Sequence, residues 1–228
     1  MRYILLLFVF FMIKSLYGQE KEKIAWQLQT VRIGANIAPY LSPLIGNSAR
    51  TGVEINADAV FNSRYFIDVA LGTQSNQINV SAYDYESRGS YIKVGFNNNL
   101  LFDKKNPKNN QDQDGIFFGI GLGASSFSQN LNYRIQNNYW GTGQYTFTDS
   151  NLLATWIDLG LNARVSLMKY FCVGIVTNLR VRTTLSKLQN PVDAGDIPGF
   201  GLNDNGYNFH AGYVLLFQIP VKQKQKQK

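Results

Sequence analysis

The sequence predicts an all-β fold, a closed antiparallel up-and-down transmembrane β-barrel of about eight strands. Apolar residues alternate with polar or small ones, most clearly over residues 156–167. A period of two is typical of a strand whose two faces meet unlike surroundings. Turn signals separate the alternating segments, and an export signal precedes them. A transmembrane barrel presents its apolar face outward around a polar interior, whereas a soluble barrel does the reverse. The export signal therefore favours the transmembrane arrangement.

Eight alternating segments lie between turn signals along the chain. They cover residues 29–40, 51–61, 64–74, 89–102, 115–128, 153–167, 170–185 and 206–219. In the clearest of them, one face carries Ile157, Leu159, Leu161, Ala163, Val165 and Leu167. Eight is the smallest number of strands that closes a membrane barrel, so we expect each segment to cross the membrane once.

The connections between these segments differ in length. Tight turns are expected at residues 62–63 and 168–169, whereas the connections 41–50, 75–88, 129–152 and 186–205 are long and polar. A polar connection at 103–114 lies on the short-turn side. Short turns at one end and long loops at the other are typical of outer-membrane barrels, with both termini periplasmic. Within the third long connection Tyr133, Ile135, Tyr145 and Phe147 alternate, so this hairpin is expected to continue as a ribbon above the membrane.

Aromatic residues near the strand ends are candidates for the girdles that flank the apolar band of a membrane barrel. They are Tyr40, Tyr65, Tyr91, Phe102, Tyr170, Phe171 and Phe217.

The N-terminus predicts export. Residues 1–18 combine a positive start, an apolar run too short to span a bilayer and an acceptable cleavage site. Cys172 is the only cysteine, so a lipid anchor after the apolar run and an internal disulfide are both excluded. We expect a short N-terminal extension at 19–28, the barrel at 29–221 and a disordered Lys-Gln tail at 222–228. The predicted location is the outer membrane of a Gram-negative cell.

The basic charge of the chain belongs mostly to its ends. Of the formal net charge of +7, the signal region accounts for two units and the lysines of the tail for four, which leaves +1. A nucleic-acid-binding domain would carry its basic residues as a patch on the folded surface. No nucleic-acid partner is therefore expected, and the remaining chain, with 14% aromatic residues and 20 glycines, suits one all-β domain.

Alternation places a set of ionisable side chains on the inward face, and we expect them to form a structural network in the lumen. The set is Arg32, Glu54, Asp58, Asp68, Lys93, Asp158, Arg164, Arg180, Arg182 and His210. Partners of opposite charge are needed to keep such groups in a narrow, poorly hydrated interior. Paired carboxylates also occur in acid and base catalysis, but no nucleophile or substrate cleft accompanies them here.

Hairpin geometry predicts neighbours within this set. Folding about Ser63 places Asp58 opposite Asp68, and extrapolated registers add Arg32 beside Asp58 and Lys93 beside Asp68, as a ring of four.

A second register prediction concerns the packing of large residues inside the barrel. Gly123 is expected opposite Trp156 and Gly121 near Asp158. Arg180 is expected opposite Trp156 and diagonal to Asp158, so that the glycines make room for an indole and an ion pair.

His210 is the single histidine and the obvious candidate for catalysis. A barrel enzyme acting on lipids would need a nucleophile near a histidine that a carboxylate orients. The expected neighbour of His210 is instead Arg182, so a structural role is the favoured interpretation. Cys172 is expected to face inward without a basic neighbour in sequence that would activate it.

Two glycine and aspartate motifs resemble ligand sites only superficially. Gly119, Gly121 and Gly123 alternate inside a strand, unlike a phosphate-binding loop between strand and helix. Residues 112–115 contain a fragment of a calcium loop without the remaining ligands. No catalytic residue, cofactor or metal is therefore expected.

Several short motifs together resemble a known family. They are Arg64-Tyr65-Phe66, Ala70-Leu71-Gly72, the run from Gly89 to Gly95, and Asp196-Ile197-Pro198-Gly199-Phe200-Gly201. The chain resembles, over most of its mature length, an uncharacterised family of Bacteroidetes outer-membrane β-barrel proteins. This resemblance implies the barrel fold and no activity.

The leading hypothesis is a small non-enzymatic outer-membrane barrel, a membrane-embedded scaffold or interaction protein that recognises partners through its long extracellular loops. Its expected partners are outer-membrane lipid and the outer-membrane assembly machinery. Two alternatives remain: a lipid-modifying enzyme that depends on His210, and a soluble periplasmic ligand-binding barrel in which Ile157, Leu159 and Leu161 line a cavity.

Overall fold

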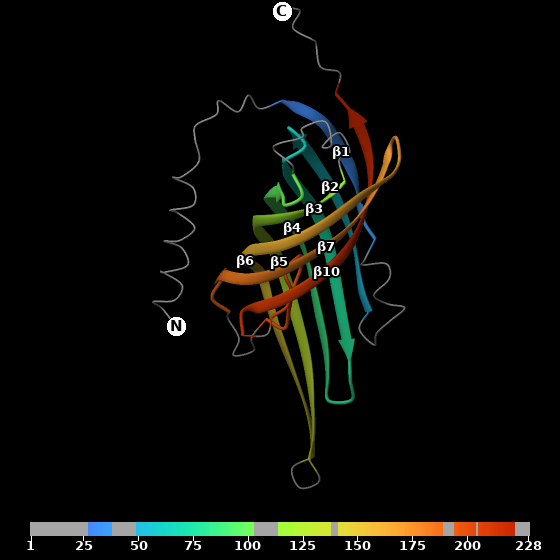
Figure 1. The fold of residues 1–228 in the computed structure, drawn as a ribbon. Coiled ribbons are helices and arrows are strands. Elements are labelled where there is room, and N and C mark those ends of the chain that lie inside the picture. The colour runs from blue at the N-terminus through green and yellow to red at the C-terminus, as the bar shows by residue number, and fades with distance from the viewer. Residues whose placement is uncertain are drawn as a thin grey trace, which may run out of the picture.

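Eight strands of the described chain close into one barrel (Figure 1). The computed structural model describes residues 27–37, 49–102, 114–137, 141–188, 194–203 and 205–221. The barrel strands are β1 (Leu28–Asn36), β2 (Ala49–Phe61), β3 (Tyr65–Asn79), β4 (Tyr83–Asn99), β5 (Gly115–Asn137), β6 (Gly141–Met168), β7 (Phe171–Leu185) and β10 (Tyr207–Pro220). Every neighbouring pair is antiparallel, and β1 pairs with β10 to close the ring. The predicted up-and-down barrel of eight strands is confirmed.

One end of the barrel, called the turn end, carries the short connections. Residues 62–64 join β2 to β3, and 169–170 join β6 to β7. Asn62 and Ser63 have φ angles of 53° and 52°, in the left-handed region that short polar residues tolerate in tight turns. Both turns lie within one residue of their predicted positions. The chain also enters β1 and leaves β10 at this end, because Leu28 pairs with Phe61 and Thr30 with Pro220.

At the opposite, loop end, strands continue beyond their predicted limits. The prediction of a long polar connection at 75–88 is wrong, because β3 and β4 extend through most of this segment and leave only residues 80–82 between them. The expected ribbon is confirmed, since β5 and β6 stay paired out to Asn137 and Gly141, with Tyr133 opposite Tyr145. Figure 1 shows this hairpin projecting well past the barrel. The register between β5 and β6 shifts between Phe127 and Gln129, and β5 stays paired with β4 out to Tyr133.

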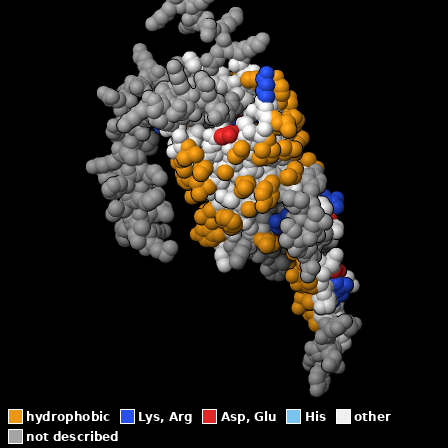
Figure 2. Space-filling view, turned by 45° about the vertical axis from the view of Figure 1, so that its right-hand side comes forward, with side chains coloured by type: hydrophobic (Ala, Val, Ile, Leu, Met, Phe, Trp, Pro, Cys, Tyr) orange, Lys and Arg blue, Asp and Glu red, His pale blue; other side chains and the backbone are white. Residues whose placement is uncertain are grey.

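The outer wall of the barrel is apolar. On the face that Figure 2 shows, hydrophobic side chains are spread over this wall, with few charged ones between them. Exposed members from around the ring include Ile33, Ile55, Leu71, Ile92, Leu122, Leu161, Ile175 and Leu215. The side chains of Leu159 and Leu161 are 39% and 51% exposed. They therefore do not line a cavity, and this finding contradicts the arrangement expected of a soluble ligand-binding barrel. In the described ranges no helix is both long and apolar enough to cross a membrane.

Aromatic residues gather on the outside of the turn end. The rings of Tyr65 and Phe96 stack with 5.5 Å between centroids, and those of Tyr170 and Phe217 stack at 6.0 Å. Phe171 meets Phe217 edge-on. Of the other predicted girdle residues, Phe102 lies beneath the Arg64 guanidinium and Tyr40 lies outside the described residues. Tyr91 is wrong as a girdle residue, because its side chain is buried inside the barrel, where it meets Glu54.

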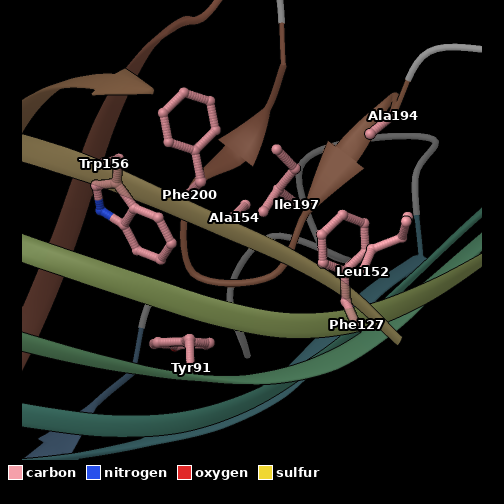
Figure 3. Packing of buried hydrophobic residues seen from close by; sticks show 8 residues of the cluster. All are labelled: Tyr91, Phe127, Leu152, Ala154, Trp156, Ala194, Ile197 and Phe200. Atoms are coloured by element: carbon pink, nitrogen blue, oxygen red, sulfur yellow. The ribbon is translucent and has the colours of Figure 1, made fainter. Parts of the chain in front are cut away.

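Residues 194–203, called the plug, fill the loop end of the barrel. They contain β8 (Asp196–Ile197) and β9 (Gly201–Leu202), which pair only with each other. Ile197 and Phe200 are fully buried. Figure 3 shows them beside Trp156, Ala154 and Leu152 of β6, with Phe127 and Tyr91 on the neighbouring strands. The prediction of an exposed loop over 186–205 is therefore wrong for the plug. Burial of the plug's apolar side chains outweighs the polar composition of the segment.

Gly199 allows the plug to lie close to the wall. A Cβ atom at this position would come 2.4 Å from the Tyr91 ring, and its φ of +77° is one that L side chains rarely adopt.

Candidate functional site

The charged interior of the barrel is the candidate site, and its first cluster lies toward the turn end. Asp58 on β2 binds Arg32 of β1, with 2.6 Å between Oδ1 and Nε, and also binds Arg164 of β6 from across the lumen. The guanidinium carbons of Arg164 and Arg32 lie 4.2 and 5.5 Å from the centroid of the Phe66 ring. The side chains of Arg32 and Asp58 are 0% and 2% exposed. One carboxylate therefore holds two buried arginines against one aromatic face.

The predicted ring of Arg32, Asp58, Asp68 and Lys93 is correct in part. Asp58 does lie opposite Asp68 and beside Arg32. Asp68 accepts a hydrogen bond from the Asn97 amide instead of from Lys93. The reason is register: Gly95 is the residue opposite Asp68, which puts Lys93 two residues further toward the loop end. The repulsion between Asp58 and Asp68 is thus relieved by Arg164 and Asn97.

The second cluster surrounds Glu54, nearer the loop end. Its carboxylate accepts hydrogen bonds from Lys93 Nζ at 2.6 Å, from the Tyr91 hydroxyl at 2.7 Å and from the Asn36 amide at 3.2 Å. These donors come from β4 and β1, and both oxygens of Glu54 are used. A buried carboxylate with this many donors is stabilised in its charged form, so the cluster ties three strands together.

The third cluster pairs Asp158 with Arg180, whose Nε lies 3.2 Å from Oδ1. Gly123 lies opposite Trp156 and Gly121 opposite Asp158, and both predictions are confirmed. The prediction that Arg180 lies opposite Trp156 is wrong: Arg180 faces Asp158 directly, and Arg182 takes the place opposite Trp156. The hairpin of β6 and β7 folds about Lys169 and not about Met168, and this difference of one residue displaces the pairing by two.

Asp196 anchors the plug to the wall. Its carboxylate binds Arg50 of β2 and accepts hydrogen bonds from the side-chain amides of Gln74 and Asn76 of β3. Burial raises the pKa of the Asp196 carboxyl above its ordinary value, and the charge of Arg50 opposes this rise. The Ser87 hydroxyl also donates to the backbone carbonyl of Asp196 at 2.7 Å. One plug residue is therefore held by three strands.

Two small cavities are among those that lie between these clusters in the described part of the barrel. One of about 70 Å³ lies in the middle of the lumen, beside Asp68, Lys93 and Asp158. The other, of about 110 Å³, lies beneath the plug, beside Arg180 and Gly199. His210 borders both of them. Neither has the size of the pockets that hold organic ligands.

His210 faces the interior, but its predicted neighbour is wrong. The residue opposite it on β7 is Asn178, whereas Arg182 bonds to Gly206 through its backbone. Arg180 is one of the charged residues that border a cavity with His210.

The other motifs occupy ordinary structural positions. Gly119, Gly121 and Gly123 lie inside β5, and Cys172 is buried on β7. Asp114 caps the β6 backbone by accepting a hydrogen bond from the amide of Ser166 at 2.6 Å, while residues 112 and 113 lie outside the described ranges. Within those ranges no group of three or more His, Cys, Asp and Glu residues gathers as a metal site would require.

The predicted network did not include several polar residues that complete the interior. They are Asn36, Arg50, Tyr91, Asn97, Asn162 and Asp196. The alternation that selected the charged set also places Asn36, Asn97 and Asn162 inward, so the signal was present but was applied only to ionisable residues. For Asp196 no periodic signal existed, because the plug is not a barrel strand.

Comparison with known proteins gives a family and a fold. Residues 1–224 match a family described as Domain of unknown function (DUF6048). No curated protein matches the chain. Among solved structures, the chain is similar to the N-terminal β-barrel domain of Pseudomonas aeruginosa OprF, at 10% sequence identity and a TM-score of 0.33. That similarity covers 85% of this chain and 99% of the OprF domain.

Proposed function

The chain belongs to the DUF6048 family, whose function is unknown, and we propose that it is a non-enzymatic outer-membrane β-barrel, a scaffold or interaction protein. The observation that supports this proposal is that the barrel has an apolar outer wall and a charged interior, the reverse of a soluble protein. Leu122 and Ile55 on the outer wall are 65% and 57% exposed, while the ion pairs of Asp58 and Glu54 are buried. An apolar wall of this extent is unfavourable in water and matches the hydrocarbon core of a bilayer.

The turn end faces the periplasm in this proposal, and the loop end faces outward. Short connections, the start of β1, the end of β10 and the aromatic cluster of Tyr170, Phe171 and Phe217 lie together, as expected of the periplasmic interface. Export by the signal peptide at residues 1–18 and insertion by the outer-membrane assembly machinery belong to the same proposal. The Bacteroidetes origin is also proposed, from the family motifs.

Recognition is assigned to the ribbon formed by β5 and β6 beyond the barrel. One of its faces carries Leu131, Tyr133, Ile135, Tyr145 and Phe147, and three of these side chains are at least 40% exposed. The other face carries hydroxyl and amide side chains, such as Thr146 and Asn132, which hydrogen-bond across the strands. Exposed aromatic side chains on a rigid element are typical of protein contact surfaces.

The environment of His210 supports the non-enzymatic part of the proposal. His210 lies opposite Asn178 and borders two interior cavities, one of them beneath the plug, so it is not directed at the lipid interface where a lipid substrate would arrive. His210→Ala should therefore leave the lipid composition of cells producing the protein unchanged in mass spectrometry. A lipid profile that depends on His210 would support the lipid-modifying enzyme instead.

Fractionation of cells that produce the full chain tests the location. The protein should enter the outer-membrane fraction, begin at Gln19, and migrate differently on electrophoresis with and without heating, as a folded barrel does. Recovery in the soluble periplasmic fraction without detergent would contradict the proposal.

A further inference from the structure

The strand β6 has a free edge where it leaves the barrel. From Gly141 to Phe147 it pairs with β5 on one side only, because its pairing with β7 begins at Ala154. No other described segment forms a backbone hydrogen bond with this stretch. Backbone amides and carbonyls along the free edge therefore point away from the sheet, as they do in any edge strand, and can pair with another strand.

The free edge belongs to a broad sheet and not to an isolated hairpin. At the level of Thr146, the row of paired residues continues through Asn132 of β5 and Asp84 of β4 to Asn79 of β3. Four paired strands hold their outer edge in a fixed position, whereas an isolated pair is only marginally stable. A strand that binds here would therefore meet a preformed template.

The free edge lacks the features that usually protect exposed edges. Gly141–Phe147 contains no proline and no charged residue. At the other side of the ribbon, where β4 ends, Arg134 of β5 donates to the Val80 carbonyl at 3.1 Å and to Asp84 at 2.8 Å. The backbone amide of Arg134 also binds the carbonyl of Ala82. The β5 side of the ribbon is therefore covered at this point, and the β6 side is not.

We propose that an extended segment of another protein binds the free edge by adding a strand beside β6. The side chains of the edge define the chemistry of this segment. Tyr145 and Phe147 lie on the aromatic face of the ribbon, and Gln144 and Thr146 on the polar face. None of them is charged, so the segment alternates aromatic or aliphatic residues with uncharged polar ones. This inference rests on the proposed recognition by the ribbon and names its mode.

A second copy of this chain does not fit the free edge in the proposed membrane orientation. Two identical edges pair antiparallel about a two-fold axis perpendicular to the sheet. The ribbon projects past the barrel as a continuation of its strands (Figure 1), so this axis would invert one barrel relative to the other. Parallel pairing would need a shift along the strand, which removes the two-fold symmetry. The occupant is therefore a different protein.

A synthetic peptide with the sequence of residues 131–137 is the probe, because these residues of β5 already pair with the same part of β6. Fluorescence anisotropy of the labelled peptide should show saturable binding to the full mature chain in detergent. The same peptide with N-methylated interior amides keeps its side chains but cannot pair as a strand, and it should not bind. No saturable binding of the first peptide, or equal binding of both, would overturn the proposal.

Proline substitutions locate the bound peptide. Neighbouring residues of a strand direct their amides to opposite sides. Of Thr146→Pro and Phe147→Pro, one therefore removes a donor of the free edge and the other a donor to β5. The edge variant is the one that keeps the wild-type unfolding midpoint, and it should bind the peptide at least about tenfold more weakly. Asn132→Ala, on the same face but on β5, should bind as the wild type does. Unchanged binding by the edge variant would overturn the proposal.

The mass of the protein in detergent, measured by analytical ultracentrifugation, distinguishes the occupants. A monomer that binds the peptide is expected. A dimer that dissociates in the edge variant would assign the free edge to a second copy and overturn the proposal. A protein that fractionates with the outer membrane but does not bind the peptide would contradict this inference alone. Peptide binding by a protein recovered in the soluble periplasm would contradict the membrane location and support strand addition.

Discussion

The contact between Gly123 and Trp156 shows how a single missing side chain organises the barrel interior. A Cβ atom at Gly123 would lie 2.1 Å from the nearest indole carbon of Trp156, and Trp156 is 1% exposed. The indole therefore occupies the space that glycine leaves on the neighbouring strand. This space also lets Trp156 meet Phe200 of the plug edge-on, with 5.8 Å between ring centroids.

Gly123→Ala should destabilise the barrel by about 1 to 3 kcal/mol, because the indole must move out of a packed position. The measurement is reversible unfolding in detergent or lipid. Ala124→Leu is the control, since Ala124 lies next to Gly123 but faces outward and should cost little. Equal effects of the two substitutions would contradict the packing described for Trp156.

The ion pair between Arg180 and Asp158 allows a test based on non-additivity. Arg180→Met alone should cost about 3 to 5 kcal/mol, because it leaves the Asp158 carboxylate buried without its partner. The double substitution Arg180→Met/Asp158→Asn should cost less than the single one. Both values come from unfolding in the same detergent. A double variant less stable than Arg180→Met would show that the two residues do not depend on each other.

Strict alternation predicted which way these residues point, but not all of their partners. Gly123 and Trp156 were placed opposite each other because the register between β5 and β6 is continuous from Phe127 to the turn end. Arg180 was misplaced by two residues because the hairpin of β6 and β7 folds about Lys169 and not about Met168, and alternation does not fix the centre of a turn to one residue. The partner of Arg164 was not predictable from hairpins at all, since Asp58 reaches it across the lumen.

Among the elements, the plug differs most from expectation. The segment from Asp196 to Gly201 is rich in turn-forming residues, which predicts a solvated loop. Its inward position depends on contacts far apart in sequence, such as Asp196 with Arg50 and Phe200 with Trp156. The ribbon, in contrast, was predictable because both of its strands retain a period of two.

Asp196→Ala should release the plug while leaving the barrel closed. The substitution removes the carboxylate that Arg50, Gln74 and Asn76 bind, and the strands of the wall do not depend on it. Hydrogen exchange should become faster over residues 194–203 and remain slow over β2 and β3. Asp84→Ala removes a partly exposed ion pair with Arg134 and should leave exchange in the plug unchanged. Slow exchange of the plug in the Asp196 variant would show that its apolar contacts alone hold it.

For the molecule as a whole, the proposed function depends on where the polar and apolar side chains lie, and alternation in the sequence determines this arrangement. Buried charges are tolerated inside because each cluster pairs opposite signs, as Lys93 does with Glu54 at 2.6 Å. Exposed apolar side chains outside have no comparable compensation in water. The sequence predicted both faces from alternation and needed the export signal to choose between lipid and water. A ligand or partner was not predictable, because the ribbon and plug surfaces carry no periodic or motif signal for one.

The most direct test of the membrane assignment is the free energy of unfolding of Leu159→Arg in lipid bilayers. Leu159 faces outward between the exposed apolar residues Ile120 of β5 and Leu179 of β7, so the substitution should cost about 2 to 4 kcal/mol if this face meets the bilayer centre. Leu153→Arg lies on the same face of the same strand but six residues nearer the loop end, at the level of Ser126 on β5 and Ser90 on β4, and should cost no more than about 1 kcal/mol. Equal stability of wild type and Leu159→Arg would show that the apolar wall does not lie in lipid, and would contradict the outer-membrane barrel.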